Sequence, residues 1–406
     1  MIHQLQLANG LWLVAEPIAS AQSLAMTLRV PAGVVQEPGD KQGVAAVLAE
    51  MLLRGAGERD ARQHSEALDR LGVQRGTSVT TQHLHVHASM LGVNLAAAMP
   101  LVLDMVLRPM LADSAVGPAR DLAIQSIDAL DDEPQQRVML ELKRRHFPEP
   151  FGRSSLGERE HLRTVSREDV VAYWQRTCRP RGTILGVAGR FDWPALREQV
   201  ESLTAEWSGE VVEPVETAAA ARGYAHERSE SSQVHIGVAY DAPPEPAAES
   251  MLQRAATAVL SGGMSGRLFT EVREKRGLCY AVYASYSPGR DRGAVLAYSG
   301  TTTPRAQETL DVLTGELRRL GDGIDDAEFG RAIIGMKSRL VMQGESTGAR
   351  AAAIAGDQYA LGRPRTLDEL AAEVDRVTLD AVNQYVRERR PKDMTIVTVG
   401  PEALRV

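Results

Sequence analysis

The chain has 406 residues, which is long enough for two domains with separate hydrophobic cores. The apolar fraction of 44% and charged fraction of 24% are ordinary for a globular protein, and the net charge of −7 gives no reason to expect nucleic-acid binding, which needs a basic surface. The two cysteines, Cys178 and Cys279, predict neither a disulfide framework nor a cysteine zinc site.

No apolar run is long enough to cross a membrane, and residues 1–20 lack the basic-then-apolar layout of a secretion signal. The sequence as given therefore predicts a cytoplasmic protein with no membrane partner. A periplasmic location is expected instead if a leader has been trimmed from the chain.

Alternating segments and amphipathic stretches predict a mixed α/β pattern in the first half of the chain. Residues 2–8 and 11–16 alternate around Asn9-Gly10, which is a hairpin signal. Further strands are expected at 23–30, within 73–92 and at 182–189, and helices at 43–54, 61–71, 94–106, 117–130, 135–146 and 166–176.

The second half repeats this order, with strands at 233–240, 278–287 and 293–300 and helices at 249–260, 266–276, 304–320 and 325–343. Val165 aligns with Val377 and Tyr173 with Tyr385 at one constant offset, which indicates an internal duplication. We therefore predict an α/β (α+β) protein of two homologous domains, each an antiparallel or mixed sheet with helices on one face. The expected divisions are a domain at 1–207, a linker at 208–223 and a domain at 224–406.

Residues 261–280 form the stretch around which chemistry could be built. Gly262-Gly263 breaks one helix, and Ser265 is placed to cap the next. Glycines before a helix are also typical of phosphate-binding loops, but no lysine and serine or threonine follow as they do in a P-loop.

Arg273, in the last turn of that second helix, is expected to lie close to Tyr280 on the following strand, since Gly277 ends the helix between them. A guanidinium and a phenol facing one cleft are rigid donors that suit a peptide carbonyl or a developing oxyanion. The same spacing is compatible with an Arg273 that pairs with Glu271 or Glu274 on a solvated face and a Tyr280 in the core.

His83, His85 and His87 alternate along one predicted strand, so their side chains project from the same face. This spacing could bind a transition metal, but the segment contains no carboxylate or cysteine, and histidine tracks are common on half-exposed strands.

Three motifs occur in the chain: SIDALDDEP at 126–134, FPEPFGRSSLG at 147–157 and LFTEVREKRGLCYAVYASY. In colinear order over nearly the whole chain, the sequence resembles the pitrilysin-type (inverzincin) metallopeptidases, most closely the half-length subunits of the mitochondrial processing peptidase group. The resemblance implies the LuxS/mitochondrial processing peptidase-like metallohydrolase fold. It also implies paired subunits that enclose unstructured peptides.

In catalytic members of this family, an inverted His-x-x-Glu-His motif and a later Glu hold zinc and activate water. The matching positions here are Ala46, Ala49, Glu50 and Ser126, which cannot hold the metal or supply the base. Catalytic members also use an Arg and a Tyr to hold the substrate carbonyl, and the resemblance implies that Arg273 and Tyr280 have this role here. It also implies a substrate-guiding glycine loop, here Gly262, Gly263 and Ser265.

These residues predict a non-zinc subunit that works with a homologous zinc-bearing subunit in a heterodimer, so that zinc is expected in the partner and no cofactor in this chain. One alternative is a catalytically inactive peptide-binding or scaffold protein. Another is a metal-binding protein that uses His83, His85 and His87.

Overall fold

The computed structural model describes residues 2–406, which divide into two compact units. Unit 1 comprises Met1–Ala129, Arg153–Thr217 and Gln343–Thr366, and unit 2 comprises Leu130–Gly152, Ala218–Met342 and Leu367–Val406. Each unit is described by itself. Within the described residues, no helix combines the length and apolar character needed to cross a membrane.

Unit 1 is built on a six-stranded mixed sheet. Its strands, in spatial order, are β1 (His3–Gln6), β2 (Trp12–Pro17), β8 (Ile184–Gly189), β3 (Ser23–Val30), β7 (Leu84–Leu91) and β6 (Gln74–Val79). Only β2 and β8 pair in parallel. The predicted hairpin between β1 and β2 is confirmed, with Gly10 at φ +93° and the Asn9 side chain accepting a hydrogen bond from the Leu11 amide at 3.1 Å.

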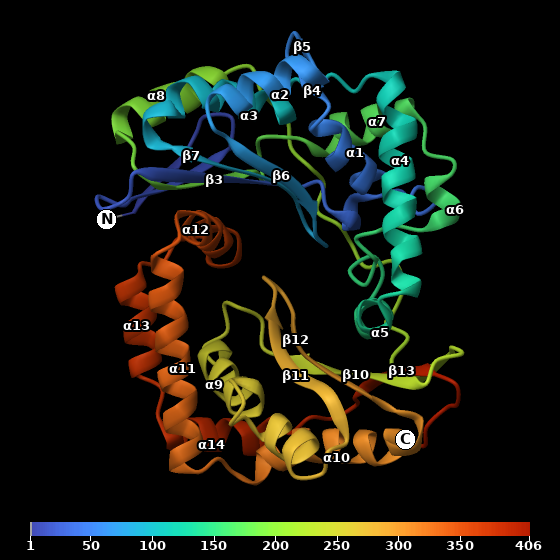
Figure 1. Cartoon of the computed structure of the whole chain (residues 1–406). Helices are drawn as coiled ribbons and strands as arrows, with labels where there is room; N and C mark the ends of the chain where they lie inside the picture. The colour runs from blue at the N-terminus through green and yellow to red at the C-terminus, as the bar shows by residue number, and fades with distance from the viewer. Residues whose placement is uncertain (1) are drawn as a thin grey trace. The chain divides into compact units, whose positions relative to one another are not determined.

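Most helices of unit 1 cover one face of this sheet (Figure 1). They are α1 (Val44–Leu52), α2 (Ala61–Arg70), α3 (Leu95–Leu107), α4 (Asp113–Asp128), α6 (Arg159–Leu162), α7 (Arg167–Thr177) and α8 (Trp193–Leu203), with a short ribbon of β4 (Gly55–Ala56) and β5 (Arg59–Asp60) between α1 and α2. Alternate strand residues such as Leu13, Met26 and Val86 are buried beneath them. Burial of this apolar face is what holds the sheet and helices together.

Unit 2 has a five-stranded sheet in the order β11 (Cys279–Pro288), β12 (Gly293–Thr302), β10 (Gln233–Ala242), β13 (Thr395–Gly400) and β9 (Tyr224–Arg228), with β13 and β9 parallel. Its other elements include α9 (Ser250–Ser261), the π-helix η4 (Phe269–Glu274), α10 (Ala306–Arg319), α11 (Asp326–Gly344), α13 (Leu367–Asp375) and α14 (Leu379–Glu388). The order β11-β12-β10-β13-β9 repeats β6-β7-β3-β8-β2 of unit 1. The internal duplication predicted from Tyr173 and Tyr385 therefore has its counterpart in the strand order.

Each sheet carries one further helix on its second face, and that helix comes from the other half of the sequence. In unit 1 it is α12 (Thr347–Leu361), which packs on β8, β3 and β2 (Figure 1). In unit 2 it is α5 (Pro134–His146), which packs on β10 and β13. The fold class is confirmed, but the expectation of helices on one face of each sheet omitted these two.

Close contacts hold α12 against the sheet of unit 1. A Cβ at Gly186 of β8 would lie 2.4 Å from the Ala351 carbonyl oxygen of α12, so only glycine permits this approach. Arg350 of α12 is buried and donates from Nε to Glu16 of β2 at 2.7 Å. Compared with the predicted divisions 1–207 and 224–406, segment 130–152 belongs to unit 2 and segment 343–366 belongs to unit 1. The predicted divisions describe the sequence repeats, and as such they stay a prediction.

Candidate functional site

The predicted pair of Arg273 and Tyr280 lies together on one exposed side of unit 2. The Arg273 guanidinium carbon is 5.2 Å from the centre of the Tyr280 ring and 4.8 Å from that of Phe269. Tyr280 is 85% exposed, so it does not lie in the core, which was the alternative that the sequence left open. Among the described residues Arg273 forms no ion pair, with Glu271 or otherwise, which leaves its N–H donors open to a ligand.

Two backbone irregularities position the side chains of Arg273 and Tyr280. The helix expected at 266–276 is largely a π-helix, in which the Lys275 amide donates to the Thr270 carbonyl five residues earlier. On the strand side, the β11–β12 register shifts between Cys279 and Ala281, so Tyr280 lies in a bulge outside the ladder. Wide helical turns and bulges both occur often at functional sites, because they re-aim a side chain.

The buried face of the same helix fixes its position. Leu268 and Val272, which share one helix face because they are four residues apart, are fully buried in the core of unit 2. Gly277 adopts the predicted left-handed conformation, at φ +60°, and turns the chain into β11. Arg273 is therefore held between a buried helix face and a strand.

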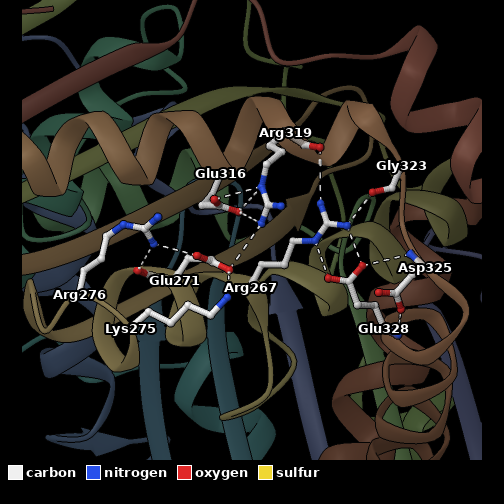
Figure 2. Close-up of polar contacts among 9 residues, drawn as sticks. All are labelled: Arg267, Glu271, Lys275, Arg276, Glu316, Arg319, Gly323, Asp325 and Glu328. Atoms are coloured by element: carbon white, nitrogen blue, oxygen red, sulfur yellow. Dashed lines mark hydrogen bonds and ion pairs between the residues drawn. The ribbon is translucent and has the colours of Figure 1, made fainter.

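An ion-pair network holds this helix against α10 and α11 (Figure 2). The buried Arg267 donates from Nε and Nη2 to the two carboxylate oxygens of Glu328, each at 2.7 Å, and from Nη2 to the Gly323 carbonyl at 2.6 Å. Glu271 accepts from Lys275 at 2.7 Å and from Arg276 at 2.8 Å, and these two cations hold its pKa below its usual range. Arg267 and its partners were not anticipated from the sequence.

Arg319 of α10 extends the network, because it chelates Glu316 on its own helix and lies 3.8 Å from Glu271 (Figure 2). The cations Lys275, Arg276 and Arg319 are exposed, so each ion pair that they form contributes little. The pair of Arg267 and Glu328 is different, because it is largely buried and bidentate.

The glycine loop lies directly before this helix. Added Cβ atoms would lie 2.3 Å from the Ala258 carbonyl oxygen at Gly262 and 2.8 Å from the Leu260 carbonyl oxygen at Gly266, whereas a Cβ at Gly263 would meet no atom. Close packing therefore explains why glycine is needed at positions 262 and 266, but not at position 263. Ser265 is exposed and forms no helix cap, so the predicted cap is wrong.

An open pocket is formed between this loop and α11. Its lining residues are Ala258, Val259, Gly262, Gly263, Ser265, Gly266, Glu328, Arg331, Ala332, Gly335 and Arg339. The three residues expected to guide substrate therefore border a pocket. The two arginines on its α11 side were not found from the sequence.

The positions that match the inverted zinc motif lie in unit 1. Ala46, Ala49 and Glu50 are on α1, and Ser126 is on α4, which packs against α1 (Figure 1). Ala49 is buried among apolar residues, and the Ser126 hydroxyl donates to the Leu122 carbonyl at 3.0 Å. Glu50 is the one residue of a metal-ligating type among these four positions, and its carboxylate lies 4.0 Å from Arg54, just beyond the end of α1.

A buried carboxylate not anticipated from the sequence fixes the start of α1. Glu37 is 5% exposed, and its Oε1 accepts from the amides of Gly43 and Ala45 at 3.0 and 2.9 Å. Burial raises the pKa of Glu37 to about 7, although the two amide donors oppose the rise. The helix that carries the motif positions is therefore anchored by a group that titrates near neutrality.

The three histidines on and beside β7 do not form a metal site. His83 lies against Tyr359 with ring centres 4.4 Å apart, and the Arg29 guanidinium is 3.5 Å from its Nδ1. Burial, Arg29 and His87 lower the pKa of His85 to about 4. A cation within the cluster opposes metal binding, and the described residues contain no group of three His, Cys, Asp or Glu side chains placed to hold a metal.

Two family models match the chain in colinear order. One, described as insulinase (peptidase family M16), matches residues 13–158, and the other, described as the peptidase M16 inactive domain, matches residues 164–336. The chain belongs to the M16 peptidase family, also called the pitrilysin family, as its motifs indicated.

Relatives and solved structures agree with this assignment. A Mycobacterium tuberculosis protein named an uncharacterized zinc protease is 25% identical, with 97% of this chain and 92% of that protein aligned. A Bacillus subtilis protein with the same description is 25% identical over 99% of this chain and 98% of its own length.

Among solved structures, a peptidase M16 inactive domain from Pseudomonas fluorescens superposes with a TM-score of 0.88 at 18% identity, covering 100% of this chain and 99% of the other. A Helicobacter pylori protease gives a TM-score of 0.89 at 16% identity, with 99% of each chain covered. A chain of complex III2 from Candida albicans gives 0.84 at 17% identity, covering 99% of this chain and 96% of that one. At these identities the superpositions establish the fold alone.

Proposed function

We propose that this chain is the non-zinc subunit of an M16 peptidase pair, and that it binds the carbonyl of an unstructured peptide which a zinc-bearing homologue hydrolyses. One observation carries the proposal: the exposed Arg273–Tyr280 pair has no competing ion pair among the described residues, while alanines occupy two positions of the zinc motif.

In the proposed role, the Arg273 guanidinium and the Tyr280 hydroxyl donate hydrogen bonds to the scissile carbonyl oxygen. Because both donors are held by the π-helix and the bulge, little reorganisation is needed as negative charge develops on that oxygen. Ala46, Ala49, Glu50 and Ser126 give this chain no means of its own to bind zinc, so the partner would supply the metal-activated water.

The test is an activity assay on the purified chain, on a zinc-bearing M16 homologue from the same organism, and on an equimolar mixture. A quenched, unstructured peptide is the substrate, and zinc in each protein is quantified by metal analysis of untagged material. The proposal predicts no stoichiometric zinc in this chain and hydrolysis that rises only on mixing. Hydrolysis by this chain alone, or bound zinc at one per chain, would overturn it.

A scaffold or peptide-binding protein without catalysis is the competing function. In that case, mixing with this chain would leave the homologue's hydrolysis rate unchanged. Alternatively, the unmodified chain and a variant substituted at Arg273 would change that rate to the same extent.

A further inference from the structure

We infer that the face of α11 beside the glycine loop binds an acidic, partly apolar segment of an extended peptide. This inference rests on the proposed function for its substrate, and it adds a charge preference that the Arg273–Tyr280 pair does not provide. Arg331 and Arg339 line the pocket together with Gly335, which lies between them on the same helical face. With no side chain at Gly335, the Arg339 side chain extends over that position, and its Nη1 would lie 3.7 Å from a Cβ added there.

Both arginines are exposed, and neither pairs with an acidic group among the described residues. The pocket's own carboxylate, Glu328, is already chelated by Arg267 (Figure 2). Lys337, the other cation of this part of α11, pairs with Asp375. Residues 329–342 contain no Asp or Glu, so this surface is basic in a chain whose net charge is −7.

Apolar side chains border the same surface. Met342, which falls on the same face of α11 as Arg331 and Gly335, is among the most exposed large apolar residues of the chain, and so is Met264 in the loop between pocket residues Gly263 and Ser265. Exposed apolar side chains that gather around a pocket mark an interaction site more often than scattered ones do. Together with the free guanidinium groups, they suit a peptide that carries both carboxylates and apolar side chains.

The helix geometry also sets a spacing. Arg331 and Arg339 are separated by eight residues, or about 12 Å along the helix axis. An extended peptide advances about 3.3 Å per residue, so carboxylates about four residues apart would reach both arginines from the same side of the peptide. The preferred segment therefore has the pattern acid-x-x-x-acid, with apolar residues between.

The test measures fluorescence anisotropy of short, labelled, C-terminally amidated peptides bound to the intact chain. One peptide has two glutamates four positions apart, a second has them adjacent, and a third has glutamine at both positions. A glutamine peptide with a free C-terminal carboxylate distinguishes side-chain recognition from terminus recognition. We expect the spaced glutamate peptide to bind on the order of tenfold more tightly than the glutamine peptide, because each exposed ion pair contributes up to about fivefold.

The double variant R331Q/R339Q is expected to abolish this preference, whereas R387Q/R405Q removes two exposed arginines outside the pocket and should retain it. Equal binding of all peptides, or equal losses in the two double variants, would overturn the inference. Since the assay uses the chain alone, its outcome is separate from that of the mixing experiment. Mixing-dependent hydrolysis without a charge preference would refute only this inference, and the preference without hydrolysis would refute only the proposed function.

Discussion

Replacement of Arg267 by methionine should destabilise unit 2, although Arg267 touches neither Arg273 nor the pocket floor. The Arg267 side chain is 8% exposed and makes two hydrogen bonds to Glu328 and one, at 2.6 Å, to the Gly323 carbonyl. Methionine fills much of the same volume but leaves the Glu328 carboxylate without its cation.

Removal of one partner of a buried ion pair costs about 3–5 kcal/mol. Glu328 is 18% exposed and still accepts from the Asp325 amide at 3.1 Å, which places the expected loss near the lower end, at about 3 kcal/mol. The exposed Arg276, which shares Glu271 with Lys275, provides the control, and R276M should cost less than about 1 kcal/mol.

Urea unfolding followed by circular dichroism measures the loss. The four tryptophans, Trp12, Trp174, Trp193 and Trp207, all belong to unit 1, so their fluorescence reports on that unit separately. The variants R267M, E328M and R267M/E328M complete a double-mutant cycle, with an expected coupling of about 2 kcal/mol or more. A coupling below about 0.5 kcal/mol, or a loss in R267M no larger than in R276M, would show that this pair does not anchor the helix.

Two further predictions concern unit 1. The pKa of Glu37 is raised to about 7 in the folded chain from an ordinary value of 4.5, so its contribution favours folding below pH 4.5 and is lost as pH rises towards 7. Between pH 5 and pH 8 the unmodified chain should therefore lose up to about 3 kcal/mol more unfolding free energy than E37Q does. Parallel plots of unfolding free energy against pH for the two proteins would contradict this. R350A should lower the unfolding free energy of unit 1, followed by tryptophan fluorescence, by about 3 kcal/mol. The reason is that Glu16 of β2 loses the buried cation that α12 supplies. A loss below about 1 kcal/mol would mean that apolar contacts alone hold α12.

Local patterns in the sequence were sufficient for most elements and for the internal repeat. The hairpin at Gly10, the buried positions Leu268 and Val272, and the left-handed Gly277 all follow from rules that act within a few residues. The proximity of Arg273 and Tyr280 followed from the same rules, because one turn joins the helix to the strand.

The features that escaped sequence reasoning depend on contacts between distant segments. The amphipathic pattern of α5 and α12 shows that each buries a face, but not which sheet receives it. The partners of Arg267 come from the end of α10, the turn at Gly323 and α11, about 50–60 residues away. The bulge at Tyr280 appears only when β11 is paired with β12. Arg331 and Arg339 look like ordinary surface residues until the glycine loop is placed beside them.

The most direct test of the central claim is the hydrolysis rate of the mixed pair when this chain carries Tyr280→Phe. The substitution removes one hydroxyl from a side chain that is 85% exposed, so the fold should be unaffected. If Tyr280 donates to the reacting carbonyl, kcat/KM should fall by roughly 10²–10³-fold, while R276M in the same mixture stays near the unmodified rate. An unchanged rate with Tyr280→Phe would contradict the assignment of carbonyl binding to this chain.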